Sequence, residues 1–411
     1  MLKKELSVQS FFLGKKWQGK PLKFMKVALV YDRVNKWGGA ERVLLALHEL
    51  FPKAPLYTSV YHSQKAEWAE VFDVRTSFLQ KFPKASSRHE AYALFMPSAF
   101  KSFSFDEYDL VISVTSDAAK GIVTNPKTKH ICYCLTPTRY LWSGYDDYFR
   151  NPFFRLLSLP AVLCLRGWDK AVSKKPDYFI AISKEVQKRI KKYYGRDSKV
   201  IYPPLTINVG GPAKSFLPAS APSHIRSATT SVCAVGSLST FVTPQNNYFL
   251  IVSRLVPYKK IDLAIGAFNK LKLSLKIIGT GSEEKKLKSM ASPNIEFLGN
   301  LTDNQVVEYY RNCVALIFPS FEDFGLTILE AQSFGKPVVA FRGGGALETV
   351  IKGKTGDFFY PQTEKALFNK LKTFKPLKYC PEDCIEQASK FGKERFKEDL
   401  LSFIEEIFTK K

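Results

Sequence analysis

The sequence has no apolar run long enough to cross a lipid bilayer. Spanning takes roughly 20 predominantly apolar residues, and the most apolar stretch, residues 153–165, is interrupted by Arg155 and Pro160. We therefore expect a buried core helix there, with a helix lying on a membrane surface as the alternative. No continuous apolar segment follows the first lysines, which argues against a signal peptide.

Cysteine is too sparse and too irregularly spaced for a disulfide framework. The 411 residues include seven cysteines, so we expect free thiols and a cytoplasmic setting. Cys132 and Cys134 lie two residues apart in an apolar run, and no second pair completes a zinc-binding pattern. Buried packing is the favoured interpretation, and no metal site is expected.

Acidic residues are outnumbered by basic ones. The chain has 38 Asp and Glu against 61 Lys and Arg, a formal net charge of +23, which attracts nucleic acid, anionic lipid or phosphorylated substrates. No zinc finger, basic zipper or RNA-binding aromatic signature appears, which argues against nucleic acid as a partner. Instead we expect reversible binding to an anionic membrane surface. The basic clusters that suggest it are Lys3, Lys4, Lys15, Lys16, Lys20, Lys23 and Lys26, then Lys174, Lys175, Lys184, Lys188, Arg189, Lys191 and Lys192.

Short apolar runs alternate with helical patterns along the chain, which predicts an α/β protein with parallel sheets covered on both faces. The expected strands of the first half are 26–31, 109–114, 130–134 and 178–183, with helices at 40–50 and 184–194. The expected strands of the second half are 248–253, 275–279, 294–298, 314–318 and 337–341, with a helix at 261–271. Two Rossmann-like domains facing across a cleft are the predicted fold.

Composition divides the chain further. Residues 1–24 form a basic N-terminal extension, and 25–206 form the first Rossmann-like domain. Residues 207–247 are rich in Ser, Ala, Thr and Pro with few charges, which predicts a flexible, dispensable linker. Residues 248–380 form the second Rossmann-like domain, and 381–411 are expected to be one long amphipathic helix.

The strongest motif runs from Glu322 to Glu330. It follows an expected strand and opens a helix, so the N–H groups near Phe324, Gly325 and Leu326 would face a ligand. Glu322 can accept hydrogen bonds from sugar hydroxyls, and Glu330, about two turns on, can reach a ribose diol. An ordinary acidic helix start, favoured by the helix dipole, is the alternative.

A second motif, Ser253-Arg-Leu-Val-Pro-Tyr-Lys259, also follows a strand. Arg254 and Lys259 can neutralise a diphosphate, Arg as a planar fork and Lys as a point charge. The alternative is a solvated basic loop. Glycines follow other strands and permit close backbone approach to a phosphate, although tight turns explain them equally well. They are Gly38, Gly39, Gly279, Gly281 and Gly343–Gly345.

Together and in this order, these motifs resemble glycosyltransferase family 4, retaining enzymes with a GT-B fold. The resemblance covers residue 25 to the C-terminus except 207–247. It implies an acceptor domain first and a donor-binding domain second, with the 381–411 helix packing back on the first. It also implies that Glu322 contacts the donor sugar, Glu330 the ribose, and Arg254 and Lys259 the diphosphate. Gly279, Phe324, Gly325 and Leu326 would join this donor site, with Gly38 and Gly39 near the phosphates.

Residues 132–140 resemble the branch that builds O-antigen and related polysaccharides, with many mannosyltransferases. Relatives place His where this chain has Leu135; that His faces the donor sugar, and Thr136 could partly replace it. The resemblance implies retention of configuration without metal or cofactor, a nucleotide diphosphate sugar as donor, and a glycan or lipid-linked acceptor. A non-catalytic sugar-nucleotide-binding protein and a sugar-nucleotide epimerase remain alternatives.

Overall fold

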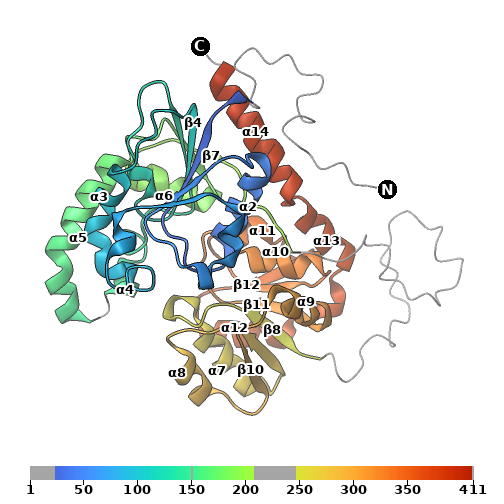
Figure 1. Ribbon diagram of the computed structural model, residues 1–411. Coiled ribbons are helices and arrows are strands. Elements are labelled where there is room, and N and C mark those ends of the chain that lie inside the picture. The colour runs from blue at the N-terminus through green and yellow to red at the C-terminus, as the bar shows by residue number, and fades with distance from the viewer. Residues whose placement is uncertain (1–23, 150, 208–246, 410–411) are drawn as a thin grey trace, which may run out of the picture. The chain divides into compact units, whose positions relative to one another are not determined.

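The computed structural model describes residues 24–149, 151–207 and 247–409 (Figure 1). They form two compact units. Unit 1 holds the chain up to Pro204 together with Phe391–Lys411, and unit 2 holds Leu205–Lys390. The expected basic extension and the expected linker lie almost wholly outside the described residues.

Unit 1 is built on a seven-stranded parallel sheet. Its strands, in spatial order, are β3 (Val74–Thr76), β2 (Leu56–Thr58), β1 (Val27–Tyr31), β4 (Leu110–Thr115), β5 (Lys129–Cys134), β6 (Tyr178–Ala181) and β7 (Lys199–Val200). Strands β1 and β4 are buried along their whole length, which explains why they read as unbroken apolar runs. The strand order reverses between β1 and β4, so ligands are expected at the carboxyl ends of these two strands.

The helices of unit 1 cover this sheet, and short 3-10 turns connect them. The helices are α2 (Gly39–Leu50), α3 (Met96–Lys101), α4 (Tyr145–Tyr148), α5 (Pro152–Val172), α6 (Lys184–Tyr194) and α14 (Lys393–Thr409). The 3-10 segments are Ser63–Lys65, Glu67–Val71, Phe78–Lys81, His89–Phe95 and Ala119–Gly121. Helix α6 has the predicted bounds because Ser183 caps its first turn and Gly195, in the left-handed region, ends it.

Unit 2 repeats the pattern with six parallel strands. They are ordered β10 (Ile295–Gly299), β9 (Leu275–Ile278), β8 (Phe249–Val252), β11 (Ala315–Phe318), β12 (Val338–Phe341) and β13 (Gly356–Phe359). Alternate residues of β8 enter two different cores, Phe249 and Ile251 on one face and Leu250 on the other. The order reverses between β8 and β11, which is therefore the expected ligand edge of this unit.

Helices lie on both faces of the unit 2 sheet. They are α7 (Ile261–Leu271), α8 (Glu284–Met290), α9 (Asp303–Asn312), α10 (Leu326–Ser333), α11 (Ala346–Thr349), α12 (Glu364–Thr373) and α13 (Pro381–Ser389), with 3-10 turns at Pro257–Lys259 and Pro376–Lys378. The α/β architecture with two Rossmann-like units is thus confirmed. Strands β2, β3 and β13 were not predicted, because two of them span only three residues and none stands out as an apolar run.

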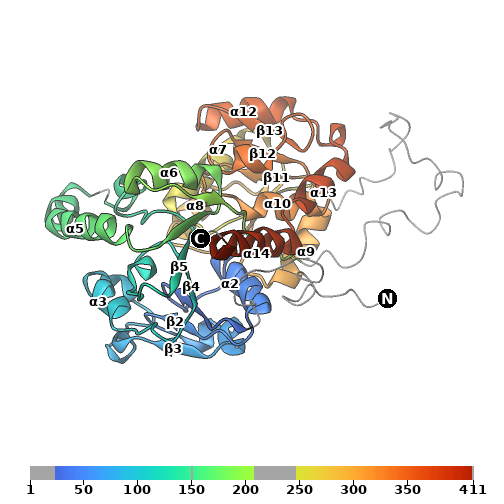
Figure 2. The same cartoon turned by 90° about the horizontal axis from the view of Figure 1, so that it is seen from above.

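The single helix expected over residues 381–411 is wrong. The chain forms α13, which packs on α10 in unit 2, and α14, which packs on α2 in unit 1 (Figure 2). Between them Phe391 is buried with its ring 5.1 Å from that of Tyr202, and Gly392, a poor helix former, follows. The break therefore divides the segment into two helices, each of which buries its apolar residues in its own unit.

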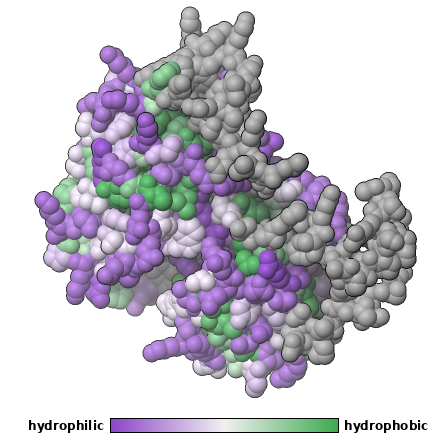
Figure 3. All heavy atoms as spheres, turned by 45° about the vertical axis from the view of Figure 1, so that its right-hand side comes forward, coloured by the Kyte–Doolittle hydropathy of each residue, from purple (hydrophilic) through white to green (hydrophobic). Residues whose placement is uncertain are grey.

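The buried core helix expected at residues 153–165 is also wrong. The segment is helical, as the first half of α5, but most of its large apolar side chains are exposed. The face drawn in Figure 3 shows hydrophobic patches among hydrophilic residues. Within the described ranges, no helix combines the length and apolarity needed to cross a membrane.

Candidate functional site

The two strongest sequence motifs meet at the ligand edge of unit 2. The loop after β8 carries Arg254 and Lys259, and the loop after β11 carries Glu322. Because β8 and β11 are neighbours in the sheet, their carboxyl ends bring these three side chains together. The strand order reverses at this edge, which is where open α/β sheets bind ligands.

Lys259 and Glu322 form an ion pair through Nζ and Oε1. Their side chains are 10% and 21% exposed, and Ser320 Oγ donates a second hydrogen bond to the same carboxylate oxygen at 2.8 Å. The sequence motifs predict that the Glu322 carboxylate contacts a sugar and that the Lys259 ammonium contacts a diphosphate. In this structure the two groups neutralise each other's charge. A sugar phosphate would satisfy both, phosphate oxygens on Lys259 and hydroxyls on Glu322.

Arg254 is held by a residue that sequence reasoning did not use. Its Nη2 donates to the hydroxyl of Tyr258, and its guanidinium lies 5.9 Å from the centre of that ring. Lys259 Nζ lies 5.4 Å from the same ring. Tyr258 therefore contacts both cations, and its place in the same loop, four residues after Arg254, was the available signal.

Glu330 lies on α10 and is only 7% exposed. Tyr310 of α9 donates its hydroxyl to Glu330 Oε2 at 2.7 Å. The Tyr310 ring is itself fully buried and stacks on Phe334. This hydrogen bond fixes the direction of the Glu330 carboxylate, and the separation of twenty positions along the chain explains why sequence reasoning missed Tyr310.

The start of α10 has the geometry predicted for a ligand-facing helix terminus. Gly325 is the N-cap with φ +91°, a left-handed conformation that favours glycine. Phe324 is buried beside it, and Leu326 is the first helical residue. The first N–H groups of a helix lack intrahelical partners and carry partial positive charge, so an anion is favoured at this end.

The glycines after β9 and β12 are explained by packing. A Cβ at Gly279 would overlap the carbonyl oxygen of Ser253, which directly precedes Arg254. Side chains at Gly344 and Gly345 would overlap the backbone of Glu322 and Phe324, and the Gly345 N–H donates to the Glu322 carbonyl at 2.9 Å. These glycines hold the two loops of the site in place.

The other predicted residues belong to unit 1. Gly38 precedes α2 and Gly39 begins it. A Cβ at Gly38 would press on Glu41, which is buried and accepts a hydrogen bond from Tyr31 at 2.6 Å. Beyond β5, Leu135 is half-buried.

Thr136 is engaged within unit 1. It is 5% exposed, and its hydroxyl accepts a hydrogen bond from Arg189 Nη1 at 3.3 Å. Arg189 is buried and paired with Glu185 at 3.1 Å. Arg189 was counted in the basic cluster predicted to bind a membrane, and its burial corrects that prediction. Thr136, buried and bonded to Arg189, is poorly placed to replace a sugar-facing His.

A carboxylate cluster at the ligand edge of unit 1 was missed. Asp32 follows β1 and accepts hydrogen bonds from Thr115 Oγ1 and the Ser116 and Ala119 N–H groups at 2.7–2.9 Å. Asp117 follows β4, lies 3.5 Å from Arg33 and accepts from the Tyr140 hydroxyl at 3.0 Å.

Burial, reinforced by the Asp32 charge, raises the pKa of Asp117 to about 6. The signal was Asp32 directly after β1 and Asp117 two residues after the end of β4. In the part of the chain that the structure describes, no group of three or more His, Cys, Asp or Glu side chains has the geometry of a metal site.

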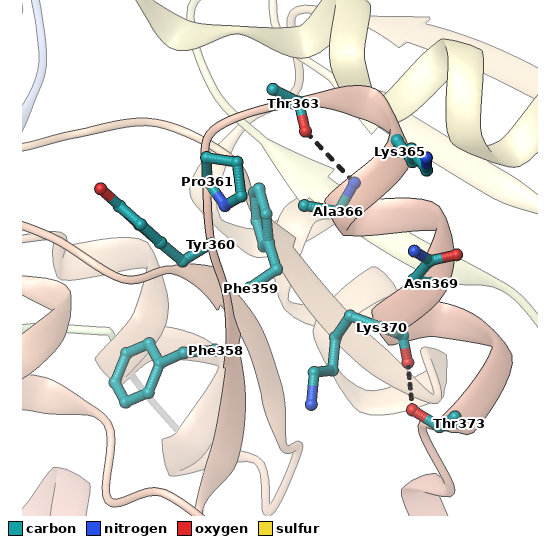
Figure 4. A pocket seen from close by; sticks show the side chains of 10 residues that line it. All are labelled: Phe358, Phe359, Tyr360, Pro361, Thr363, Lys365, Ala366, Asn369, Lys370 and Thr373. Atoms are coloured by element: carbon teal, nitrogen blue, oxygen red, sulfur yellow. Dashed lines mark hydrogen bonds between the residues drawn. The ribbon is translucent and has the colours of Figure 1, made fainter.

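A cavity of about 470 Å³ lies elsewhere in unit 2, between the end of β13 and α12 (Figure 4). Tyr360, 71% exposed, is at one side, and Lys370 is at the other, paired with Asp357 at 2.7 Å. None of the predicted site residues lines it. The predicted site residues therefore do not form this cavity.

Comparison with known proteins supports the sequence resemblance within unit 2. Residues 240–391 match the family described as glycosyl transferases group 1. The chain is 36% identical over 115 residues to the uncharacterized glycosyltransferase MJ1178 of Methanocaldococcus jannaschii, covering 27% of this chain and 33% of that protein. It is 34% identical over 154 residues to alpha-1,3/1,6-mannosyltransferase ALG2 of Dictyostelium discoideum, covering 30% and 37%. The chain thus matches about a third of the length of these relatives.

Solved structures with the same fold cover nearly the whole chain. Anabaena Alr3699/HepE in complex with UDP matches with a TM-score of 0.65 at 20% identity, over 92% of this chain and 99% of that one. Sucrose-phosphate synthase from Thermosynechococcus elongatus matches with a TM-score of 0.64 at 16% identity, over 94% and 100%. At these identities the likeness confirms the fold, and the family match confirms the resemblance for the residues it covers.

Proposed function

We propose that the protein is a retaining glycosyltransferase that moves a hexose, of mannose or glucose type, from a nucleotide diphosphate sugar to a glycan or lipid-linked acceptor. The observation that carries the proposal is the meeting of Arg254, Lys259 and Glu322 at the β8–β11 edge. Cations for a leaving diphosphate and a carboxylate for sugar hydroxyls lie side by side there, at the start of a helix.

In this mechanism the chain positions charge. As the glycosidic bond breaks, negative charge grows on the diphosphate, and Arg254 and Lys259 stabilise it; charge arranged in advance is often the largest single catalytic contribution. Glu322 holds the sugar hydroxyls, and the acceptor attacks from the face that the diphosphate leaves, which retains the configuration. The leaving diphosphate takes the acceptor proton, so no metal or cofactor is required.

The donor class is supported by the names of similar proteins. Relatives include ALG2 and a GDP-mannose-dependent mannosyltransferase of Mycolicibacterium smegmatis, and the structural neighbour Alr3699/HepE is known in complex with UDP-glucose. We place the activity in cell-surface polysaccharide synthesis at the cytoplasmic face of the membrane. Cys132, Cys134, Cys313 and Cys384 are buried free thiols, in keeping with a reducing compartment.

The direct test screens purified protein against GDP-mannose, UDP-glucose and related donors, with binding and turnover measured separately. Transfer to a saccharide acceptor with retained anomeric configuration, read by NMR, supports the proposal. Conversion of the donor without an acceptor would identify an epimerase instead.

A non-catalytic sugar-nucleotide-binding protein is the second candidate, because Leu135 stands where relatives place a sugar-facing His. It predicts donor binding without turnover. The variant Leu135→His separates the two functions. If the parent protein is inactive and this variant transfers sugar, the absence of activity in the parent is due to Leu135.

A further inference from the structure

Helix α5 carries an apolar stripe on the side that faces away from unit 1. Its inward contacts come from Val162, Leu165, Asp169 and Val172, all buried. On the opposite side, large apolar side chains follow at helical spacing. Phe153, Leu156, Leu157 and Leu163 are 69%, 72%, 68% and 55% exposed, and Cys164 is exposed among them. In both ribbon views α5 lies at the rim of unit 1 (Figures 1 and 2).

This face is the reverse of an ordinary surface helix, whose outer side is polar. Between residues 152 and 165 the only charged residue is Arg155. Its guanidinium forms an ion pair with Asp146 at 3.0 Å and lies over the ring of Tyr145. Soluble proteins rarely expose a continuous apolar patch, and such patches mark interaction surfaces.

The same side of the helix becomes basic further along. Lys170 follows Leu163 by seven residues, the spacing that keeps a helical face. Lys174 lies in the turn directly after the helix, and both lysines are exposed. Exposed lysines also line α6, at Lys184, Lys188, Lys191 and Lys192. An apolar stripe continued by lysines matches an acyl-chain boundary beside anionic headgroups.

We propose that the outer face of α5 docks unit 1 on an anionic lipid bilayer, with Phe153, Leu156, Leu157 and Leu163 inserted below the headgroups and Lys170 and Lys174 among them. From Phe153 to Cys164 the stripe is about 17 Å long at 1.5 Å per residue. That is too short for a bilayer core of about 30 Å, so the helix lies in the plane of the membrane. The proposal is independent of the transfer reaction and is tested without a donor.

The first experiment measures co-sedimentation with phosphatidylcholine vesicles, with and without phosphatidylglycerol. Binding requires the anionic lipid and weakens as salt rises. Leu156→Glu combined with Leu163→Glu lowers the affinity about tenfold or more, because two charges must leave water. Leu377→Glu, at an 82% exposed position in unit 2, is the matched control and binds as wild type. A double variant that is folded and still binds as wild type overturns the proposal.

Cys164 offers a second readout, since it lies within the stripe. In a variant lacking Cys233 and Cys380, an environment-sensitive fluorophore on Cys164 shifts to shorter wavelength with anionic vesicles and is quenched by lipids brominated in their acyl chains. Vesicle binding without these changes would assign docking to another surface. Shielding of the label without vesicles, lost at low protein concentration, would identify a second copy of the chain as the occupant and overturn the lipid assignment.

Discussion

Glu322 shows how one side chain joins stability to function. It is paired with Lys259, whose side chain is only 10% exposed, and it receives a hydrogen bond from Ser320. Its removal therefore leaves a nearly buried ammonium without this carboxylate, but it opens no cavity in the apolar core. We expect Glu322→Ala to fold with a lower unfolding temperature, because the Lys259 charge loses this partner, and to lose about a hundredfold or more of transfer activity. Steady-state transfer and thermal unfolding measured on the same preparation check this; unchanged turnover would remove Glu322 from the site. Glu322→Gln keeps the shape and isolates the charge.

Arg254 and Lys259 are expected to act on the diphosphate alone. Each substitution by Ala removes a charge-assisted hydrogen bond, a loss of about 1.5–3 kcal/mol, or roughly ten- to a hundredfold in affinity. Titration calorimetry with the nucleoside diphosphate and with the bare nucleoside separates the effects, because only the former weakens. Lys365→Ala, an exposed lysine on α12, is the control. If both site variants bind the diphosphate normally, the phosphate contacts lie elsewhere.

His130 predicts a pH dependence of stability. It is fully buried with Nε2 2.8 Å from Ser113 Oγ, and burial lowers its pKa from 6.5 to about 3. Below pH 6.5 the unfolded chain therefore binds a proton at this histidine that the native state does not bind. The contribution of neutral His130 to the free energy of unfolding is fully present above pH 6.5. It is lost as the pH falls toward 3, by about 1.4 kcal/mol per pH unit. Denaturant unfolding between pH 7 and 4 should show this decline.

His130→Gln should flatten part of the decline. Burial also lowers the pKa of His89 to about 3. His89 should therefore cause part of the loss of stability at low pH that persists in the variant. A variant whose stability falls with pH as steeply as wild type would show that His130 does not contribute.

At the scale of elements, two glycines are expected to respond oppositely to alanine. Gly167 lies in α5 with open space around its Cα, so Gly167→Ala should stabilise unit 1 by about 0.5–1 kcal/mol. Gly279 has φ +131° and meets the Ser253 carbonyl, so Gly279→Ala should destabilise unit 2 and displace the Arg254 loop. Chemical denaturation of both variants measures the two signs, and equal effects would contradict the packing argument.

The bounds of α6 and α7 match the sequence expectation. Capping residues and apolar periodicity agree in α6, and apolar periodicity alone was sufficient in α7. Hydropathy failed at α5 because it cannot tell an apolar residue facing the core from one facing outward. In the site, Arg254, Lys259 and Glu322 were predictable because strand-end loops of a parallel sheet converge. Tyr310 and Asp117 were missed because their roles depend on contacts between separate elements. Ser320 contacts Glu322 within one loop, where no helical or strand periodicity indicates which side chains meet.

At the scale of the whole molecule, removal of metal ions tests whether transfer activity depends on a metal. If Arg254 and Lys259 neutralise the leaving diphosphate, exhaustive treatment with EDTA should leave transfer activity within about twofold of the untreated enzyme, since two cations already supply the stabilising charge. Activity restored only by an added divalent ion would contradict this, and would show that the two side chains are insufficient by themselves.

Helix α14 ties the last part of the chain to unit 1. Phe396, Leu400, Leu401 and Ile404 are buried there, and Lys397 lies 2.6 Å from Glu49 of α2. During translation, residues 205–390 must be made before α14 exists, roughly ten to forty seconds at 5–20 residues per second. Throughout that interval the nascent unit 1 presents an uncovered apolar surface beside α2. The unit that is synthesised first is therefore completed last, and chaperones would have longest access to this surface.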